Sequence, residues 1–210
     1  MKGRFFAKGR DAVESRQRSG AKSVPGNSVF LVGFMGAGKT SVGRALAKRL
    51  HWIFEDLDDR IEQREGRTIA EIFRDSGEEA FRQAEWAVLQ QVLEELRRGV
   101  AKVVALGGGT FAQPRVHHAL QMSGIRTVFL DARLEELWRR CELQSQGTKR
   151  PLRTSQQMFR ELYKARLPYY ETASLRIDTG GKQVEMIVSE VIRRLDLKPI
   201  VTRTEQGELE

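Results

Sequence analysis

The chain has 210 residues, of which 40% are hydrophobic and 30% are charged, and its formal net charge is +8. This composition predicts a soluble globular protein with one main domain, and no run approaches the roughly 20 apolar residues that a membrane-spanning helix needs. A single cysteine, Cys141, excludes an intrachain disulfide and a cysteine-rich metal cluster, so we expect a reducing, cytoplasmic setting.

The excess of positive charge is concentrated at the N-terminus. Residues 1–27 contain seven Lys/Arg and two Asp/Glu and have no clear apolar period. We therefore expect a flexible basic arm over 1–27, followed by the folded body. A contact with nucleic acid or a membrane surface is the alternative for such an arm.

The first element of the body predicts a phosphate-binding site. An apolar run over 28–33 is typical of a buried parallel strand, and 41–50 has helical spacing of apolar residues. Between them lies GFMGAGKT, in which glycines let backbone N–H groups point at phosphate oxygens. Lys39 would reach the outer phosphates, and the Thr40 hydroxyl could bind Mg²⁺. The residues expected to line this nucleotide site are Gly36, Ala37, Gly38, Lys39, Thr40 and Ser41.

Two carboxylates follow the second predicted strand, which covers 52–54. If the strand continues, alternation points the side chains of Asp56 and Asp58 the same way. One could hold a Mg²⁺-bound water, and the other could accept a proton from a substrate hydroxyl, as phosphoryl transfer to an alcohol requires. The alternative is a helix N-cap with solvated acids.

Further along, Arg82 and Glu85 lie three residues apart in a predicted helix over 80–97, so they share a face and can pair. A third strand over 102–106 ends in Gly107, Gly108 and Gly109. A plain turn rarely needs three glycines, which instead let the backbone approach a ligand closely.

The C-terminal half contains basic groups in a different setting. Arg140 precedes a polar stretch that leads to Arg150, and such a stretch suits a lid, placed at about 141–153, that closes over phosphates. Arg166 stands near the end of a predicted helix over 156–170, where binding a carboxylate and capping the helix are both open.

Strands alternate with helices along the body, which predicts a parallel sheet covered on both faces. The remaining strands are expected at 126–130 and 175–178, and the remaining helices at 69–73, 113–122, 134–142 and 184–195. Ligands gather at the carboxyl ends of strands in such sheets, where the loop at 33–40, Asp56–Asp58, the triple glycine and Asp131 would converge. We expect the domain to cover 28–198 and a flexible acidic tail to cover 199–210.

Taken together, these segments resemble shikimate kinase. The motifs occur in order over roughly 28–195, and their combination is far more specific than the phosphate loop alone. They are GFMGAGKTS at 33–41, DLDDRIE at 56–62, TIAEIF at 68–73, GEEAFRQAE at 77–85, GGG at 107–109, KRPL at 149–152 and RLPYYETA at 166–173. The resemblance implies a nucleoside-monophosphate-kinase-like, three-layer α/β fold with a P-loop, a five-stranded parallel sheet and a lid.

The resemblance also implies an activity and its substrate residues. The family transfers the ATP γ-phosphate to the 3-hydroxyl of shikimate, giving shikimate 3-phosphate and ADP, in chorismate and aromatic amino acid biosynthesis. Asp58 would hold that hydroxyl as its base or orienter. Arg82 and Arg166 would clamp the substrate carboxylate beside the backbone of Gly107, Gly108 and Gly109, since guanidinium forks meet carboxylates bidentately.

On the nucleotide side, the resemblance places Lys39 and Arg150 on the phosphates as catalytic cations, and Thr40 and Asp56 at Mg²⁺. Arg140 and Gln183 would border the adenine of ATP. The stretch between Arg140 and Arg150 is slightly long for the family, and Arg153 replaces a usual leucine, so the adenine-side arginine is not fixed by the motif.

Two other functions fit parts of the sequence. Gluconate-type kinases share the loop, sheet and lid, but they would lack the combination of Asp-x-Asp, Phe-Arg-x-x-Glu and triple glycine. A nucleotide-binding regulator would use its basic arm to bind nucleic acid in a salt-sensitive manner and turn over little ATP. We expect instead a monomeric kinase of a small molecule, with neither a membrane nor a nucleic-acid partner.

Overall fold

The computed structural model describes residues 26–144 and 155–200. Its centre is a sheet of five strands that all run parallel, in the order β2-β3-β1-β4-β5. The strands are β1 (Ser28–Val32), β2 (Ile53–Asp56), β3 (Lys102–Ala105), β4 (Arg126–Asp131) and β5 (Leu175–Asp178).

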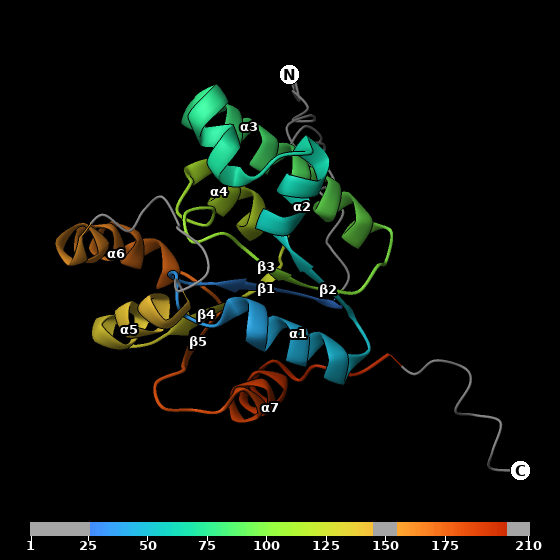
Figure 1. The fold of residues 1–210 in the computed structure, drawn as a ribbon. Coiled ribbons are helices and arrows are strands. Elements are labelled where there is room, and N and C mark those ends of the chain that lie inside the picture. Colours follow the sequence, from blue (N-terminus) through green and yellow to red (C-terminus); the bar gives the residue numbers. More distant parts are fainter. Residues whose placement is uncertain (1–25, 145–154, 201–210) are drawn as a thin grey trace, which may run out of the picture.

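Helices cover both faces of this sheet (Figure 1). Helices α2, α3 and α4 lie on one face and α1 and α7 on the other, while α5 and α6 stand beside the β4–β5 side. The helices are α1 (Lys39–Leu50), α2 (Leu57–Glu65), α3 (Ile69–Arg97), α4 (Pro114–Met122), α5 (Leu134–Gln144), α6 (Gln156–Tyr170) and α7 (Val184–Leu195). The expected three-layer α/β fold is therefore confirmed.

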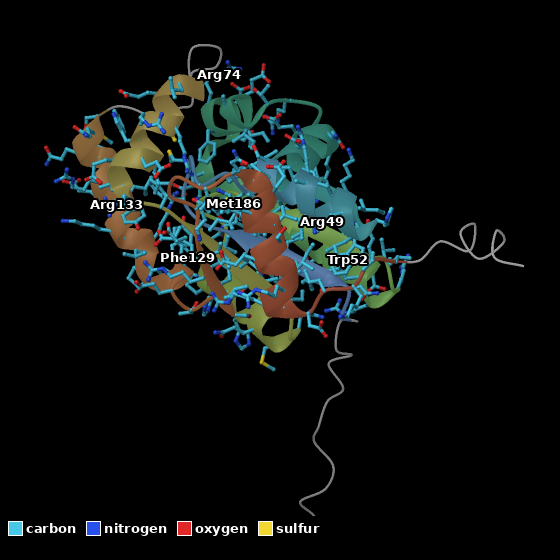
Figure 2. The ribbon with its side chains drawn as sticks, turned by 90° about the horizontal axis from the view of Figure 1, so that it is seen from below. Arg49, Trp52, Arg74, Phe129, Arg133 and Met186 are labelled. Atoms are coloured by element: carbon cyan, nitrogen blue, oxygen red, sulfur yellow. The ribbon has the colours of Figure 1, made fainter. Side chains whose placement is uncertain are left out.

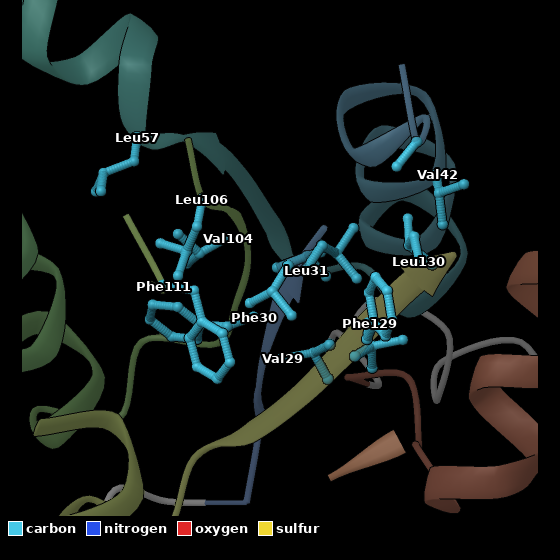
Figure 3. Close-up of a cluster of buried hydrophobic side chains, with 14 of the residues drawn as sticks. Val29, Phe30, Leu31, Val42, Leu57, Val104, Leu106, Phe111, Phe129 and Leu130 are labelled. Atoms are coloured by element: carbon cyan, nitrogen blue, oxygen red, sulfur yellow. The ribbon is translucent and has the colours of Figure 1, made fainter. Parts of the chain in front are cut away.

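The central strand of the sheet is completely buried. All five residues of β1 are buried, as a strand with helices on both faces requires. Figure 3 shows Phe30 and Leu31 among side chains of the neighbouring strands, including Val104 and Phe129. On the outer face, Arg49 of α1 donates a 2.9 Å hydrogen bond to Ser189 of α7, and Figure 2 shows Arg49 beside that helix.

One expectation about local structure needs correction. The segment after β2 does not continue as a strand: α2 begins at Leu57, so strand alternation does not align Asp56 with Asp58. The two helices expected at 69–73 and 80–97 are present within α3, where Gly77 has the non-helical angles φ 80° and ψ 175° and separates them by a kink. Thr68 is the N-cap of α3 and forms a reciprocal capping box with Glu71, which satisfies backbone N–H groups at the start of the helix.

Several expectations lie outside the described residues: most of the basic arm, the centre of the lid with Arg150, and most of the acidic tail. Among the helices of the described ranges, none combines the length and apolar character needed to cross a bilayer.

Candidate active site

The phosphate loop joins β1 to α1 through glycines in conformations that other residues avoid. Gly36 and Gly38 have φ of 79° and 87°, and α1 begins directly at Lys39. A Cβ on Gly36 would lie 2.6 Å from the Leu137 carbonyl oxygen, so the loop packs closely on α5. A Cβ on Gly38 would meet nothing within 4 Å. The loop therefore has one packed side and one open side, where the N-terminus of α1 favours an anion.

The two side chains that follow Gly38 point to different partners. Lys39 Nζ donates to the carbonyl oxygens of Gly33 at 2.9 Å and Phe34 at 3.0 Å, so this ammonium lies across the loop. Thr40 Oγ1 donates to Asp56 Oδ2 at 2.9 Å. A hydroxyl and a carboxylate oxygen are hard donors, and Mg²⁺ usually takes only one or two protein ligands beside phosphates and water. This pair of oxygens therefore fits the expected Mg²⁺ site.

Asp56 has the N-cap role that the sequence offered as one alternative, and it also contacts the phosphate loop. Asp56 is the N-cap of α2, where its Oδ1 accepts from the Asp58 backbone N–H at 3.2 Å, while its Oδ2 accepts from Thr40. Asp58 then stands in the first turn of α2, and a Cβ on Gly107 would lie 2.6 Å from its Oδ1. A helical turn, rather than strand alternation, thus brings Asp58 to the end of β3.

The triple glycine also meets both predicted clamp arginines. A Cβ on Gly109 would lie 2.9 Å from Arg166 Nη2 and 3.3 Å from Arg82 Nη2, and a Cβ on Gly108 would lie 3.5 Å from Arg166 Nη1. Arg82 comes from α3 and Arg166 from α6, 84 positions apart in the numbering. The two guanidinium groups and Asp58 therefore converge on one loop, as the sequence predicted.

A buried carboxylate holds Arg82 in place. Arg82 Nη1 donates to Glu85 Oε2 at 3.0 Å, and Glu85 is only 1% exposed. Glu85 also accepts from Thr110 Oγ1 at 2.5 Å and from Gln113 Nε2. The spacing of Arg82 and Glu85 predicted their pairing. Sequence analysis did not identify Thr110 and Gln113, which follow the triple glycine on a distant segment.

Arg166 is more enclosed than Arg82. Burial lowers the pKa of the Arg166 guanidinium, and the neighbouring positive charge of Arg82 lowers it further, whereas Tyr170 and Glu78 raise it. Two guanidinium groups side by side favour an anion between them, which would relieve their repulsion. The Tyr170 hydroxyl donates to the Gly108 carbonyl oxygen, a contact that sequence analysis did not identify.

The predicted adenine-side residues lie beyond the phosphate loop. Arg140 donates to the Thr179 carbonyl oxygen at 2.9 Å, to Glu136 Oε1 at 2.5 Å and, through a weaker 3.4 Å contact, to the Gly36 carbonyl oxygen. Arg140 therefore links α5 and the phosphate loop to the segment that leads into α7. Gln183 lies in the same segment, as the N-cap of α7. This position fits a nucleotide border, although the Arg140 guanidinium is held by protein groups.

Asp131 does not join the other polar groups at the site. Its carboxylate accepts from Arg176 at 2.6 Å on β5 and from the Tyr163 hydroxyl at 3.3 Å. Burial and the charge of Asp131 raise the pKa of Tyr163 to about 12. Asp131 thus lies at the end of β4 as expected, but its carboxylate pairs with Arg176 and Tyr163, whereas the phosphate loop, Asp56–Asp58 and the triple glycine contribute groups to the candidate site.

Comparison with known proteins shows the family of the chain. The family model described as shikimate kinase matches residues 35–196. The chain belongs to the shikimate kinase family. A shikimate kinase of Cereibacter sphaeroides is 39% identical over 181 residues, which cover 85% of this chain and 87% of that protein.

Solved structures separate the family from its fold relatives. The shikimate kinase from Acinetobacter baumannii, solved in complex with shikimate, is 31% identical with a TM-score of 0.72, over 88% of this chain and 96% of that one. A gluconokinase from Sinorhizobium meliloti is 19% identical with a TM-score of 0.52, over 83% of this chain and 94% of that one, which shows a shared fold alone. The solved shikimate kinase thus resembles this chain in both sequence and fold, whereas the gluconokinase resembles it in fold alone.

Proposed function

We propose that this chain transfers the γ-phosphate of ATP to the 3-hydroxyl of shikimate, the activity of its family. The observation that carries this proposal is the convergence of Arg82, Arg166 and Asp58 on the loop 107–109, at the same edge of the sheet as the phosphate loop. A carboxylate-bearing alcohol matches two cations and one carboxylate. Gluconate carries the same kinds of group, and the membership of the chain in the shikimate kinase family favours shikimate over it.

In the acceptor pocket, Arg82 and Arg166 would bind the shikimate carboxylate, and the backbone of Gly107, Gly108 and Gly109 would line the ring. Asp58 would accept a hydrogen bond from the 3-hydroxyl and either take its proton or only align it. Positioning of this kind is the main protein contribution to phosphoryl transfer, since the transition state is loose.

On the donor side, Lys39 would leave its loop carbonyls to contact the outer phosphates, and the backbone from Gly36 to Thr40 would bind their oxygens. Thr40 and Asp56 would hold Mg²⁺, which neutralises phosphate charge when bound. Arg150 would add a cation from the lid, Ser41 would flank the phosphates, and Arg140 with Gln183 would border adenine. We further propose a monomer in the cytoplasm, with its catalytic domain at 28–198.

A coupled assay of ADP release tests the activity. We expect turnover with shikimate and at most trace turnover with gluconate or a nucleoside monophosphate. Preference for gluconate would instead support the gluconate-type alternative, and no turnover with any acceptor would support the regulator. Omission of Mg²⁺ should abolish turnover.

Substitution of the site residues tests their roles. Asp58→Asn should lower kcat by about 100-fold or more, because an amide cannot take the proton of the attacking hydroxyl and binds that hydroxyl more weakly than a carboxylate does. Arg82→Met and Arg166→Met should each raise the KM for shikimate, by the equivalent of about 2–4 kcal/mol, because a carboxylate loses a paired cation. Steady-state kinetics with both substrates measures these effects.

Arg74→Met is the matched control for the arginine variants. Arg74 is on the same helix as Arg82, but it is exposed and pairs with Asp75. Its substitution should leave both KM values unchanged. Normal KM for shikimate in both clamp variants, or near-normal kcat in Asp58→Asn, would refute the assigned roles.

A further inference from the structure

The loop 107–109 is held from two sides by hydroxyl groups that have no role in the reaction proposed above. On one side, Thr110 Oγ1 donates to Glu85 Oε1 of α3 at 2.5 Å. On the other side, the Tyr170 hydroxyl of α6 donates to the Gly108 carbonyl oxygen. A third bond, from the Thr110 backbone N–H to the Gly107 carbonyl oxygen at 3.1 Å, closes the turn between these anchors.

The two helices use the same local arrangement. On α3, Arg82 is followed three residues later by Glu85, which receives the Thr110 hydroxyl. On α6, Arg166 is followed four residues later by Tyr170. Residues three or four apart share a helix face, so each helix presents a guanidinium and, one turn later, a contact to the same loop.

The anchors are rigid because they are buried. Tyr170 and Thr110 are 0% exposed, and the Tyr170 ring stacks on Phe129 of β4 with ring centroids 5.3 Å apart. Water therefore does not compete for these hydroxyl groups, and their loss would leave a buried polar partner without its hydrogen bond.

We propose that Tyr170 and Thr110 are positioning residues whose hydroxyl groups hold the loop 107–109 between α3 and α6 and so set the separation of the Arg82 and Arg166 guanidinium groups. The inference rests on the proposed role of these two arginines as a carboxylate clamp. Neither hydroxyl needs to touch the substrate.

Clamp geometry makes such positioning effective. Gly109 lies between the guanidinium groups, close enough that a single added carbon would contact both. Binding one carboxylate with two forks requires their spacing to hold within about half an ångström, which depends on supporting contacts. A shift of the loop toward α3 or α6 would bring Gly109 closer to the arginine of that helix and move it away from the arginine of the other helix.

Two conservative variants test the inference. Tyr170→Phe keeps the stacked ring and Thr110→Val keeps the branched shape, while each removes only the hydroxyl. We expect each to raise the KM for shikimate about 5–10-fold, with kcat and the KM for ATP within about threefold of the parent protein. Tyr169→Phe is the matched control: the neighbouring Tyr169 ring packs near His117 of α4, and removal of its hydroxyl should change neither KM.

Shikimate methyl ester distinguishes positioning from a general loss of structure. If the hydroxyl groups act through the arginine spacing, the penalty should fall on the acid, and the preference for the acid over the ester should shrink by the same 5–10-fold or so. Equal penalties on both acceptors, or a KM rise shared by ATP, would overturn the inference, as would unchanged KM for shikimate in both variants. If Arg82→Met and Arg166→Met also leave that KM unchanged, the clamp itself fails; if only the hydroxyl variants are silent, the clamp stands and the inference fails.

Discussion

At the scale of single residues, the three consecutive glycines are needed for space. Gly107, Gly108 and Gly109 are absent from the positive-φ residues of the chain, so other residues could adopt their backbone conformations. A side chain on Gly107 would displace Asp58, and one on Gly109 would displace both arginines. The sequence predicted that the backbone of these glycines approaches a ligand closely, and the structure shows that it lies close to the side chains of Asp58, Arg82 and Arg166.

This distinction predicts a difference between neighbouring glycines. In Gly109→Ala the added methyl group would push aside the ends of the Arg166 and Arg82 side chains, which are flexible, so the fold should survive while the KM for shikimate rises about 10-fold or more. In Gly108→Ala the closest protein group lies 3.5 Å away, an ordinary contact, so both arginines should stay in place and the KM should rise less than in Gly109→Ala. Kinetics and thermal unfolding of both variants measure this contrast, and equal KM values would contradict it.

At the scale of elements, an ionic network fixes α2, whose first turn carries Asp58. Lys102 of β3 is 5% exposed and donates to Glu55 of β2 at 2.5 Å and to Glu95 of α3. Arg60 of α2 bridges the same carboxylates, at 2.5 Å from Glu55 and 2.7 Å from Glu95. Two cations shared by two anions leave no buried charge unpaired, so the network can hold strand and helices in one arrangement.

The network predicts a pH dependence of stability. Hydrogen bonds from Arg60, and next from Lys102, lower the pKa of Glu95 from 4.5 to about 2. Because the folded-state pKa is depressed, this stabilisation is fully present above pH 4.5 and is lost as the pH falls toward 2. A third of the Glu95 side chain is exposed, and solvent screening should reduce the effect to about 1–2 kcal/mol.

Urea unfolding of the parent protein and Glu95→Gln across that pH range measures the effect. The free energy of unfolding of Glu95→Gln should fall less steeply with acid, and the two curves should converge near pH 2. Parallel curves would show that Glu95 titrates normally. Glu94→Gln is the matched control, since Glu94 is half exposed and pairs with Arg97 and Arg98 of the helix end.

At the scale of the whole molecule, the candidate site draws on nearly the full length of the described ranges. Its residues extend from Gly36 to Gln183 and come from both sides of the central strand. The described body therefore contains the groups proposed for ATP and for the acceptor, apart from Arg150. The basic N-terminal residues are not needed for any contact proposed at the site.

Removal of residues 1–25 should accordingly leave kcat and both KM values within about twofold. The cut belongs before Gly26, because Arg126 donates a hydrogen bond to the Gly26 carbonyl oxygen. The coupled assay on both forms measures this, with nucleic-acid binding at low and high salt as a second readout. A large loss of turnover would give the arm a catalytic role, and salt-sensitive binding that disappears with the arm would support the nucleic-acid alternative.

The sequence by itself determined the kind of fold and the chemistry of the site. Apolar runs alternating with helical periods predict a parallel sheet, because each element must bury its apolar face. The glycines and Lys-Thr of the phosphate loop predict anion binding, because this function depends on local backbone geometry. The resemblance that the ordered motifs carry then pointed to Asp58, Arg82 and Arg166, which the structure places around the loop 107–109.

Tertiary structure decided how those groups are held. Asp58 reaches the site through a helical turn, since Asp56 caps α2 instead of extending β2. The sequence did not indicate the hydrogen bonds of Thr110 and Tyr170, because their partners, Glu85 and Gly108, lie 25 and 62 positions away. Only the packing of α3 and α6 around the loop brings these groups together. Local spacing shows which side chains share a face, but a hydrogen bond between distant segments depends on how the whole sheet is ordered and packed.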